Sequence, residues 1–338
     1  DEVAAAERVA SLRRIVFAGP EGVYCLASDA IKRIVRLATL EAPDGPTFLA
    51  RLAAALRGRL EGSSPSLAVV QEVLRSGHNR LQRDCVTALR EGSLRIVAQL
   101  EASEAKVVAV SLLPGLQYEL VIIRVMTATL VGQAAARGSD EALGLKCVWA
   151  LAEQARSDDH VAVRQAAIEA LGAIAEATES RRDGVAPACV AALSPVGGDV
   201  HGAVARTLAA TLERIIVSVG SRRSIVADEG VAALLALARS DDGVARTSAT
   251  GALRGVLRKM RGVQGQIATR CIFALCERGL PYDDGSVEAS LHEVVVDADA
   301  TLGAACISSL VERSLRSGRV AEGLVATRIL HEAAMSAR

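Results

Sequence analysis

A regular recurrence of leucine constrains the fold of this 338-residue chain more than any other feature of its sequence. In the middle of the chain, an apolar residue is followed eight positions later by a leucine that has a small residue directly before it. These leucines are spaced 41 residues apart each time: Leu89, Leu130, Leu171, Leu212 and Leu253. The small residues before them are Ala88, Thr129, Ala170, Thr211 and Ala252. A fixed period of this length is typical of a repeat architecture.

Other sequence features keep the same period. The segment ARSDD at 155–159 returns at 238–242, two periods later to within one residue, and SRR at 180–182 returns at 221–223. Within each copy, the apolar and small residues are three, four, seven or eight positions apart, which places them on one face of a helix. The pattern therefore predicts repeated helices, and the small residue before each leucine predicts close packing against a neighbouring helix.

One repeat can be divided into parts over residues 221–253. We expect a short helix that ends near Gly230, a second helix over 231–238, a polar turn with Ser240, and a third helix that starts at Gly243 or Val244. This plan resembles the armadillo repeat, which has a three-helix unit of this length, and residues 163–176 resemble the related HEAT repeat. The resemblance implies an all-α, right-handed α-solenoid of about seven to eight armadillo/HEAT-type repeats.

The resemblance extends over the whole chain with uneven regularity. We expect one armadillo-like solenoid over 1–338, with irregular repeats at 1–77, regular repeats at 78–260 and degenerate or capping repeats at 261–338. The opening residues, DEVAAAERVA, look like the start of a region excised from a longer protein.

Composition favours helices and excludes several classes of partner. Hydrophobic residues make up 51% of the chain but aromatic residues only 2%, so the core is built from Ala, Leu, Val and Ile. Thirty-nine basic and 39 acidic residues cancel, which removes the broad positive field of a nucleic-acid binder, although a local patch stays open. The longest uncharged runs, such as 184–198, are too short to span a membrane. We therefore expect neither nucleic acid nor a membrane span.

The cysteines and histidines give no sign of a metal or redox site. We interpret the seven cysteines as reduced core residues of a cytosolic or nuclear protein: Cys25, Cys85, Cys147, Cys189, Cys271, Cys276 and Cys306. The spacing of Cys271 and Cys276 does not match a zinc knuckle. His160 and His201 share one repeat position, where we expect them to face solvent.

Sequence motifs of catalysis are absent as well. The chain has no phosphate-binding loop, dinucleotide-binding turn, zinc-protease helix or nucleophile elbow. The acidic pairs at 158–159 and 241–242 are explained by helix capping. We therefore expect no enzyme activity, no catalytic residue, no cofactor and no metal.

Stacked repeats leave a long concave surface lined by the third helix of each repeat, which suits a partner peptide, helix or domain. The candidate contacts are the polar residues just after the repeated leucine, for which we favour a plain solvated helix face and keep partner binding as the alternative: Arg90, Glu91, Glu213, Arg214, Arg254 and Lys259. For the single tryptophan, Trp149, we favour packing inside or between repeats, and a binding anchor is the alternative.

Arginines also recur near the start of each third helix: Arg83, Arg124, Arg164, Arg206 and Arg246. We favour a ladder of hydrogen bonds between repeats, and an arginine stripe for an acidic partner is the alternative. Positions equivalent to the Trp and Asn ladder of armadillo proteins that carry import signals hold neither residue. We therefore do not expect binding of import signals in that manner.

These observations predict a monomeric, non-enzymatic scaffold or adaptor that binds a protein partner in the cytosol or nucleus. The segment GVAALLALARSDD resembles the armadillo region of U-box ubiquitin ligases, which is one specific interpretation of the scaffold. The armadillo region of a co-chaperone is a second interpretation. A HEAT-like lyase that handles bilin chromophores is a third, since VRQAAIEALGAIA resembles it locally. The 41-residue period argues against the lyase, whose repeats are shorter.

Overall fold

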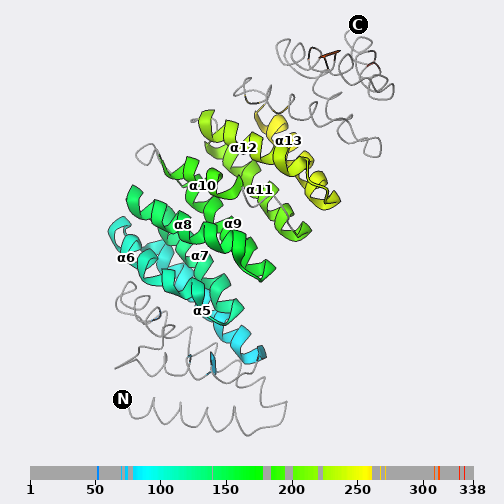
Figure 1. Cartoon of the computed structure of the whole chain (residues 1–338). Helices are drawn as coiled ribbons and strands as arrows, with labels where there is room; N and C mark the ends of the chain where they lie inside the picture. The colour runs from blue at the N-terminus through cyan, green and yellow to red at the C-terminus, as the bar shows by residue number, and fades with distance from the viewer. Residues whose placement is uncertain are drawn as a thin grey trace, which may run out of the picture. The chain divides into compact units, whose positions relative to one another are not determined.

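The computed structural model describes residues 79–260, apart from 139, 178–183, 195–200 and 220–223, together with a few isolated residues outside this range. Its regular elements there are all helical: α5 (Asn79–Gln99), α6 (Ala102–Leu112), the 3-10 helix η1 (Leu113–Gln117), α7 (Val121–Arg137), α8 (Glu141–Ser157), α9 (Val161–Glu176), α10 (Val185–Leu193), α11 (Gly202–Val219), α12 (Ser224–Ala238) and α13 (Gly243–Met260). They are labelled in Figure 1, except for η1. The chain divides into a first compact unit, Asp1–Ala177, and a second, Thr178–Arg338.

In the first unit, the described helices form two layers. One layer contains the predicted third helices, with α5 against α7 and α7 against α9. The other contains α6 and α8, which contact each other and pack on α7 and α9. Each third helix therefore packs against its equivalent in the next repeat, and the second-layer helices pack on the third helices beside them, as in a solenoid.

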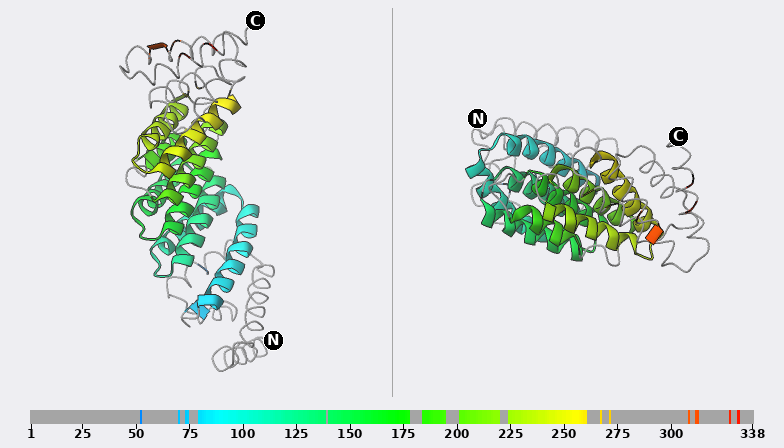
Figure 2. Two further views of the ribbon diagram at one scale, coloured as in Figure 1. Left: turned by 90° about the vertical axis from the view of Figure 1, so that its right-hand side faces the viewer. Right: turned by 90° about the horizontal axis from the view of Figure 1, so that it is seen from above.

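The second unit repeats this arrangement. Its third helices, α11 and α13, pack against each other, and α10 and α12 form the other layer. The pair α11 and α13 can be followed in the turned views of Figure 2. The α12 helix contacts both α11 and α13, so the same two-layer plan is built twice from different sequence segments.

The repeated leucines lie on the third helices and belong to the core of both units. All five closing leucines are at most 1% exposed, and burial of one leucine side chain contributes roughly 1.5–3 kcal/mol. Four of the five small residues before them are buried as well: Ala88, Ala170, Thr211 and Ala252. The prediction of an all-α solenoid is confirmed for the described helices of each unit. The total of seven to eight repeats, the superhelix handedness and the three sequence segments stay predictions.

One prediction about the inside of the repeat is wrong. The helix expected to end near Gly230 continues through it, so that α12 is a single helix over Ser224–Ala238. Gly230 is buried, and a Cβ atom there would lie 2.6 Å from Cγ1 of Ile216 on α11. This glycine allows α11 and α12 to approach each other and does not break the helix. The repeat over 224–260 is thus a helix pair of the HEAT kind, and its last helix begins at Gly243 as expected.

Candidate functional site

The structure places the six predicted contact residues in two groups. Arg90 and Glu91 are exposed on α5 in the first unit. The other four lie on the two packed third helices of the second unit, Glu213 and Arg214 on α11 and Arg254 and Lys259 on α13.

Two of these four residues bind each other. The Nζ atom of Lys259 donates to Oε1 of Glu213 at 3.0 Å, which joins α11 to α13. Gly255 makes room for this pair, because a Cβ atom there would overlap the Glu213 carboxylate. Glu213 is therefore already neutralised within the chain, and its role is to connect the two helices.

Arg254 and Arg214 complete the predicted set. Arg254 is half-buried, and its Nε atom is buried without a hydrogen-bond partner. Arg214 is exposed on the neighbouring helix. A guanidinium group presents a planar fork of N–H donors that matches a carboxylate in a bidentate geometry. Arg254 therefore has unused donor capacity, but its buried Nε atom can meet a carboxylate from outside the chain only if the side chain changes its rotamer.

The charge of α11 and α13 is strongly one-sided. The two helices carry one acidic residue, Glu213, and six cationic ones: Arg206, Arg214, Arg246, Arg254, Arg258 and Lys259. The layer formed by α10 and α12 has the opposite bias, since its charged residues are Asp228 and Glu229. Within the described helices of the second unit, the two layers therefore differ in the sign of their charge, although the whole chain has no net charge.

The surface between these cations is built from very small residues. Gly251 is exposed in the middle of α13, and a Cβ atom there would meet nothing within 4 Å. Ala210 is exposed at the equivalent position of α11, one 41-residue period earlier. Glycine inside a helix is less favourable than alanine by roughly 1 kcal/mol, and packing does not require it here. We name the exposed part of α11 and α13 with Arg206, Arg214, Arg254, Arg258 and Gly251 the basic surface.

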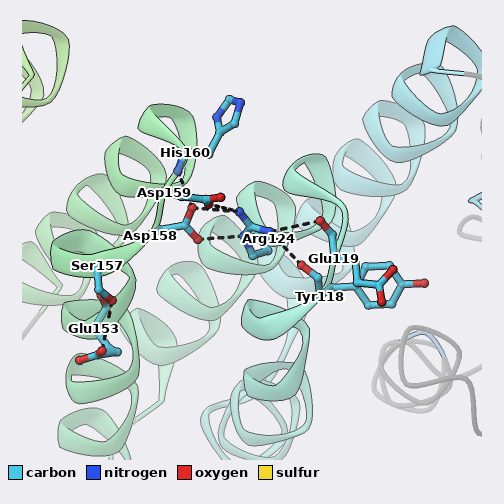
Figure 3. A network of polar contacts seen from close by, with 8 residues as sticks. All are labelled: Tyr118, Glu119, Arg124, Glu153, Ser157, Asp158, Asp159 and His160. Carbon is cyan, nitrogen blue, oxygen red and sulfur yellow. Dashed lines mark hydrogen bonds and ion pairs between the residues drawn. The ribbon is translucent and has the colours of Figure 1, made fainter.

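In the first unit, the recurring arginine at the start of α7 has a structural role. The guanidinium group of Arg124 grips Asp158 through Nε at 2.8 Å and Nη2 at 3.0 Å, and Nη2 also donates to Asp159 at 2.9 Å. Its Nη1 atom donates to the carbonyl oxygens of Tyr118 and Glu119. Figure 3 shows how Arg124 connects the turn before α7 with the turn between α8 and α9.

Arg246 at the start of α13 reproduces half of this arrangement. Its Nη1 atom donates to the carbonyl oxygens of Ser240 and Asp241, six and five residues earlier, which are the same offsets as in Arg124. The predicted ladder is present at one of its five positions: Arg124 connects two repeats, Arg246 bonds within its own, and Nε of Arg164 is buried without a hydrogen-bond partner. Arg83 and Arg206 are exposed, so the ladder does not account for them.

The two acidic pairs have different roles. Oδ1 of Asp242 accepts a hydrogen bond from the backbone N–H of Val244, which confirms capping of α13. Asp158 accepts from the N–H of His160, but its main partner is Arg124, a role that capping alone does not cover. Burial raises the pKa of Asp158, and the hydrogen bonds and charge of Arg124 outweigh this effect, so that the pKa lies below its usual value.

The favoured interpretation of Trp149 is wrong. Its side chain is not packed inside or between repeats, because the residue is 64% exposed on α8. It belongs to the other helix layer of the first unit and takes no part in the basic surface. The alternative of a binding anchor stays a prediction. Exposure could not be read from the sequence, because Trp149 sits in an apolar run, CVWALA, that looks like a core segment.

The described cysteines and histidines match their predicted surroundings. Cys85, Cys147, Cys189 and Cys271 are free and buried, and burial raises the pKa of the Cys147 thiol to about 11. Cys25, Cys276 and Cys306 lie outside the described residues. His160 and His201 are exposed as expected. Within the described residues, no group of three or more His, Cys, Asp or Glu side chains could hold a metal ion, and no helix could cross a membrane.

Comparison with known proteins adds no assignment. No family model and no curated protein matches the sequence. The chain is similar to a crystal structure of an engineered protein at 19% identity and a TM-score of 0.45, covering 99% of this chain and 86% of that one. It is also similar to importin beta (12% identity, TM-score 0.44, 96% and 45% covered) and to a chain of the Kap95:Nup1 complex (10%, 0.47, 97% and 46%). At such scores the fold rests on the helix packing alone.

Residues of the basic surface that the sequence reasoning missed are Arg258 and Gly251. A count of charges by helix would have pointed to Arg258, which lies one turn after Arg254 on α13. Gly251 could be recognised only from the open space around it, since most other helical glycines here are explained by close packing.

Proposed function

We propose that the chain is a non-enzymatic scaffold for protein–protein interaction, and that its basic surface binds an acidic segment of a partner protein. The observation that carries this proposal is the charge segregation in the second unit, with six cations and one carboxylate on the third helices. Because Glu213 is paired with Lys259, little negative charge on this surface competes with the partner.

The side chains around the cations favour a protein partner over a nucleic acid. Neither α11 nor α13 contains an aromatic residue on which bases could stack. Arginine supplies five of the six cations, and its fork matches carboxylates. The open position at Gly251 lets the backbone of a partner segment come close to α13. An extended segment rich in Asp and Glu fits these features.

The strength of such binding depends on the number of ion pairs that form together. One exposed ion pair is worth roughly 0.2–1 kcal/mol, so several must form together, and salt screens them over a Debye length of about 8 Å at physiological ionic strength. We therefore expect binding that weakens steeply with added salt. We place this adaptor in the cytosol or nucleus, for which buried, unpaired thiols are suited.

The test is affinity capture from a lysate with the purified chain, followed by identification of the bound proteins. The variant Arg214→Glu/Arg254→Glu reverses two charges on the basic surface. The matched control Arg80→Glu/Arg95→Glu makes the same change on exposed residues of α5. Circular dichroism shows whether each variant retains its helices.

We expect a partner that the first variant loses and the control keeps, and neutralisation of Glu to Gln in the partner's acidic segment should have the same effect. Equal capture by both variants would place the site elsewhere. Capture of RNA in place of protein would show that the ligand of the basic surface is a nucleic acid and not an acidic protein segment.

A further inference from the structure

A second surface lies in the first unit, on the other helix layer. Trp149 on α8 is 64% exposed, and Val107 on α6 is 59% exposed. Since α6 and α8 contact each other and bury their opposite sides against α7 and α9, these apolar side chains face outward from the same layer. Scattered surface apolar residues are ordinary, but an exposed indole is a favoured anchor of interfaces, and this is the only tryptophan of the chain.

The residues around Trp149 form one stripe along α8. Ala142, Lys146, Glu153 and Arg156 are all exposed and lie with Trp149 on one face of the helix. Lys146 is about one turn before the indole and Glu153 about one turn after it. Glu153 makes a loose ion pair with Arg156, with N and O 3.6 Å apart, and its Oε1 atom accepts a hydrogen bond from Oγ of Ser157 at 3.1 Å. Opposite charges thus flank an apolar centre at similar distances.

This order of charges is complementary to itself when it is reversed. If a second α8 runs antiparallel across the first, with the two Trp149 side chains at the crossing point, Lys146 of each copy lies opposite Glu153 of the other. The small Ala142 lies opposite the long Arg156. A two-fold interface repeats each contact, so the ion pair between Lys146 and Glu153 forms twice, once on each side of one apolar centre.

We propose that α8 is the interface of a homodimer, in which two copies of this chain pack antiparallel through the Trp149 stripe. The charges of α8 select this occupant. The helix has two acidic residues, Glu141 and Glu153, and two basic ones, Lys146 and Arg156, so a uniformly acidic or basic partner would meet as much repulsion as attraction. The proposal departs from the expected monomer and does not involve the basic surface.

The experiment is sedimentation equilibrium of the full chain over a wide concentration range, for the parent and four variants. Trp149→Ala should raise the dissociation constant of the dimer about tenfold or more, because it removes the central contact. Lys146→Glu and Glu153→Lys each place like charges opposite each other and should also weaken the dimer about tenfold. The double variant Lys146→Glu/Glu153→Lys reverses both signs and should restore the parent value to within about threefold.

The single tryptophan gives an independent readout. Its fluorescence emission should shift to shorter wavelength as the dimer forms, and the Glu169→Lys variant, with a charge change on the exposed face of α9, should behave like the parent. A monomer at every concentration would overturn the proposal, and so would a double variant that stays as weak as the single ones. A short-wavelength emission at every concentration in a monomer would show that a segment of the same chain covers Trp149.

Discussion

Two glycines at equivalent repeat positions, Gly132 on α7 and Gly255 on α13, face very different neighbours. They are 123 residues apart, which is three periods of 41. A Cβ atom at Gly132 would lie 2.5 Å from Cβ and 2.8 Å from Cα of Ala170, so α7 and α9 approach each other through their backbones. At Gly255 the same atom would meet the carboxylate of Glu213. One repeat position thus serves a tight apolar contact in the first unit and a charged one in the second.

The difference separates what the repeat requires from what it leaves open. The leucines and small residues produce the helix stack in both units, since their burial drives the packing. Contacts between third helices do not have to be apolar, and the second unit uses a flexible ion pair where the first uses a backbone contact. The unit with the looser, charged contact is also the one that displays the basic surface, which leads to matched predictions for the two units.

The largest expected difference between the two units is in the stability lost when an ion pair is broken, Arg124–Asp158 in the first unit and Lys259–Glu213 in the second. The Asp158 side chain is 4% exposed and that of Arg124 13%, whereas Lys259 is largely in solvent. Arg124→Met leaves a buried carboxylate unpaired and should lower the free energy of unfolding by about 3 kcal/mol. Lys259→Met should lower it by about 0.5 kcal/mol or less. Urea denaturation followed by circular dichroism measures both, and equal losses would contradict the comparison.

The next effect concerns the two equivalent glycines. Gly132→Ala forces a methyl group against the backbone of Ala170 and should destabilise the chain by about 2 kcal/mol. Gly255→Ala displaces only the end of the Glu213 side chain, and the better helix propensity of alanine compensates in part, so its effect should be under about 0.5 kcal/mol. Thermal unfolding of the two variants side by side tests this, and a larger loss for Gly255→Ala would show that its contact is rigid.

Replacement of Gly251 by alanine should increase the stability of the second unit. Gly251→Ala adds a methyl group in open space within α13 and should stabilise the chain by about 0.5–1 kcal/mol. Gly251→Phe should leave stability nearly unchanged but reduce capture of the acidic partner, because the ring occupies the space above α13. Calorimetry and the capture assay separate the two effects. Undiminished capture by the phenylalanine variant would remove this position from the basic surface.

The smallest effect is one of pH on the first unit. The pKa of Asp158 is lowered on folding, so its ionised form stabilises the fold at pH values above the unfolded pKa of about 3.9. This contribution is lost as the pH falls through the lower folded pKa, so stability between pH 5 and 7 should not depend on this group. In Arg124→Met, burial of Asp158 is no longer offset by the charge of Arg124, so the folded pKa rises, and part of the stability lost at neutral pH should be regained as the pH falls through it. Urea midpoints measured from pH 3 to 7 test this.

The sequence predicts the part of the fold that follows from periodicity. Leucine spacing locates the third helices α5, α7, α9, α11 and α13 because burial of an apolar face repeats with the chain. It does not predict whether α12 is one helix or two, because Gly230 is compatible with both a break and a close contact. The neighbour that decides between them, Ile216, comes from the preceding helix of the fold.

The candidate site is predicted less completely, for a similar reason. The position after the repeated leucine identifies Arg254, but pairing of Glu213 with Lys259 depends on the distance between two helices. The exposure of Trp149 and the open space at Gly251 likewise depend on which helices lie nearby. Patterns within one segment show which face is buried, and only the packed structure shows which exposed residues have partners.

The Arg124 network has a consequence for how the first unit comes apart. One side chain holds the turn before its own helix and the turn of the following repeat, so neither turn can open while the other remains unchanged. In a stack where each repeat contacts only its neighbours, such a bond adds to the coupling between adjacent repeats. Repeats joined in this way are expected to unfold together rather than one at a time. Arg124 thereby lengthens the segment of the chain that unfolds cooperatively.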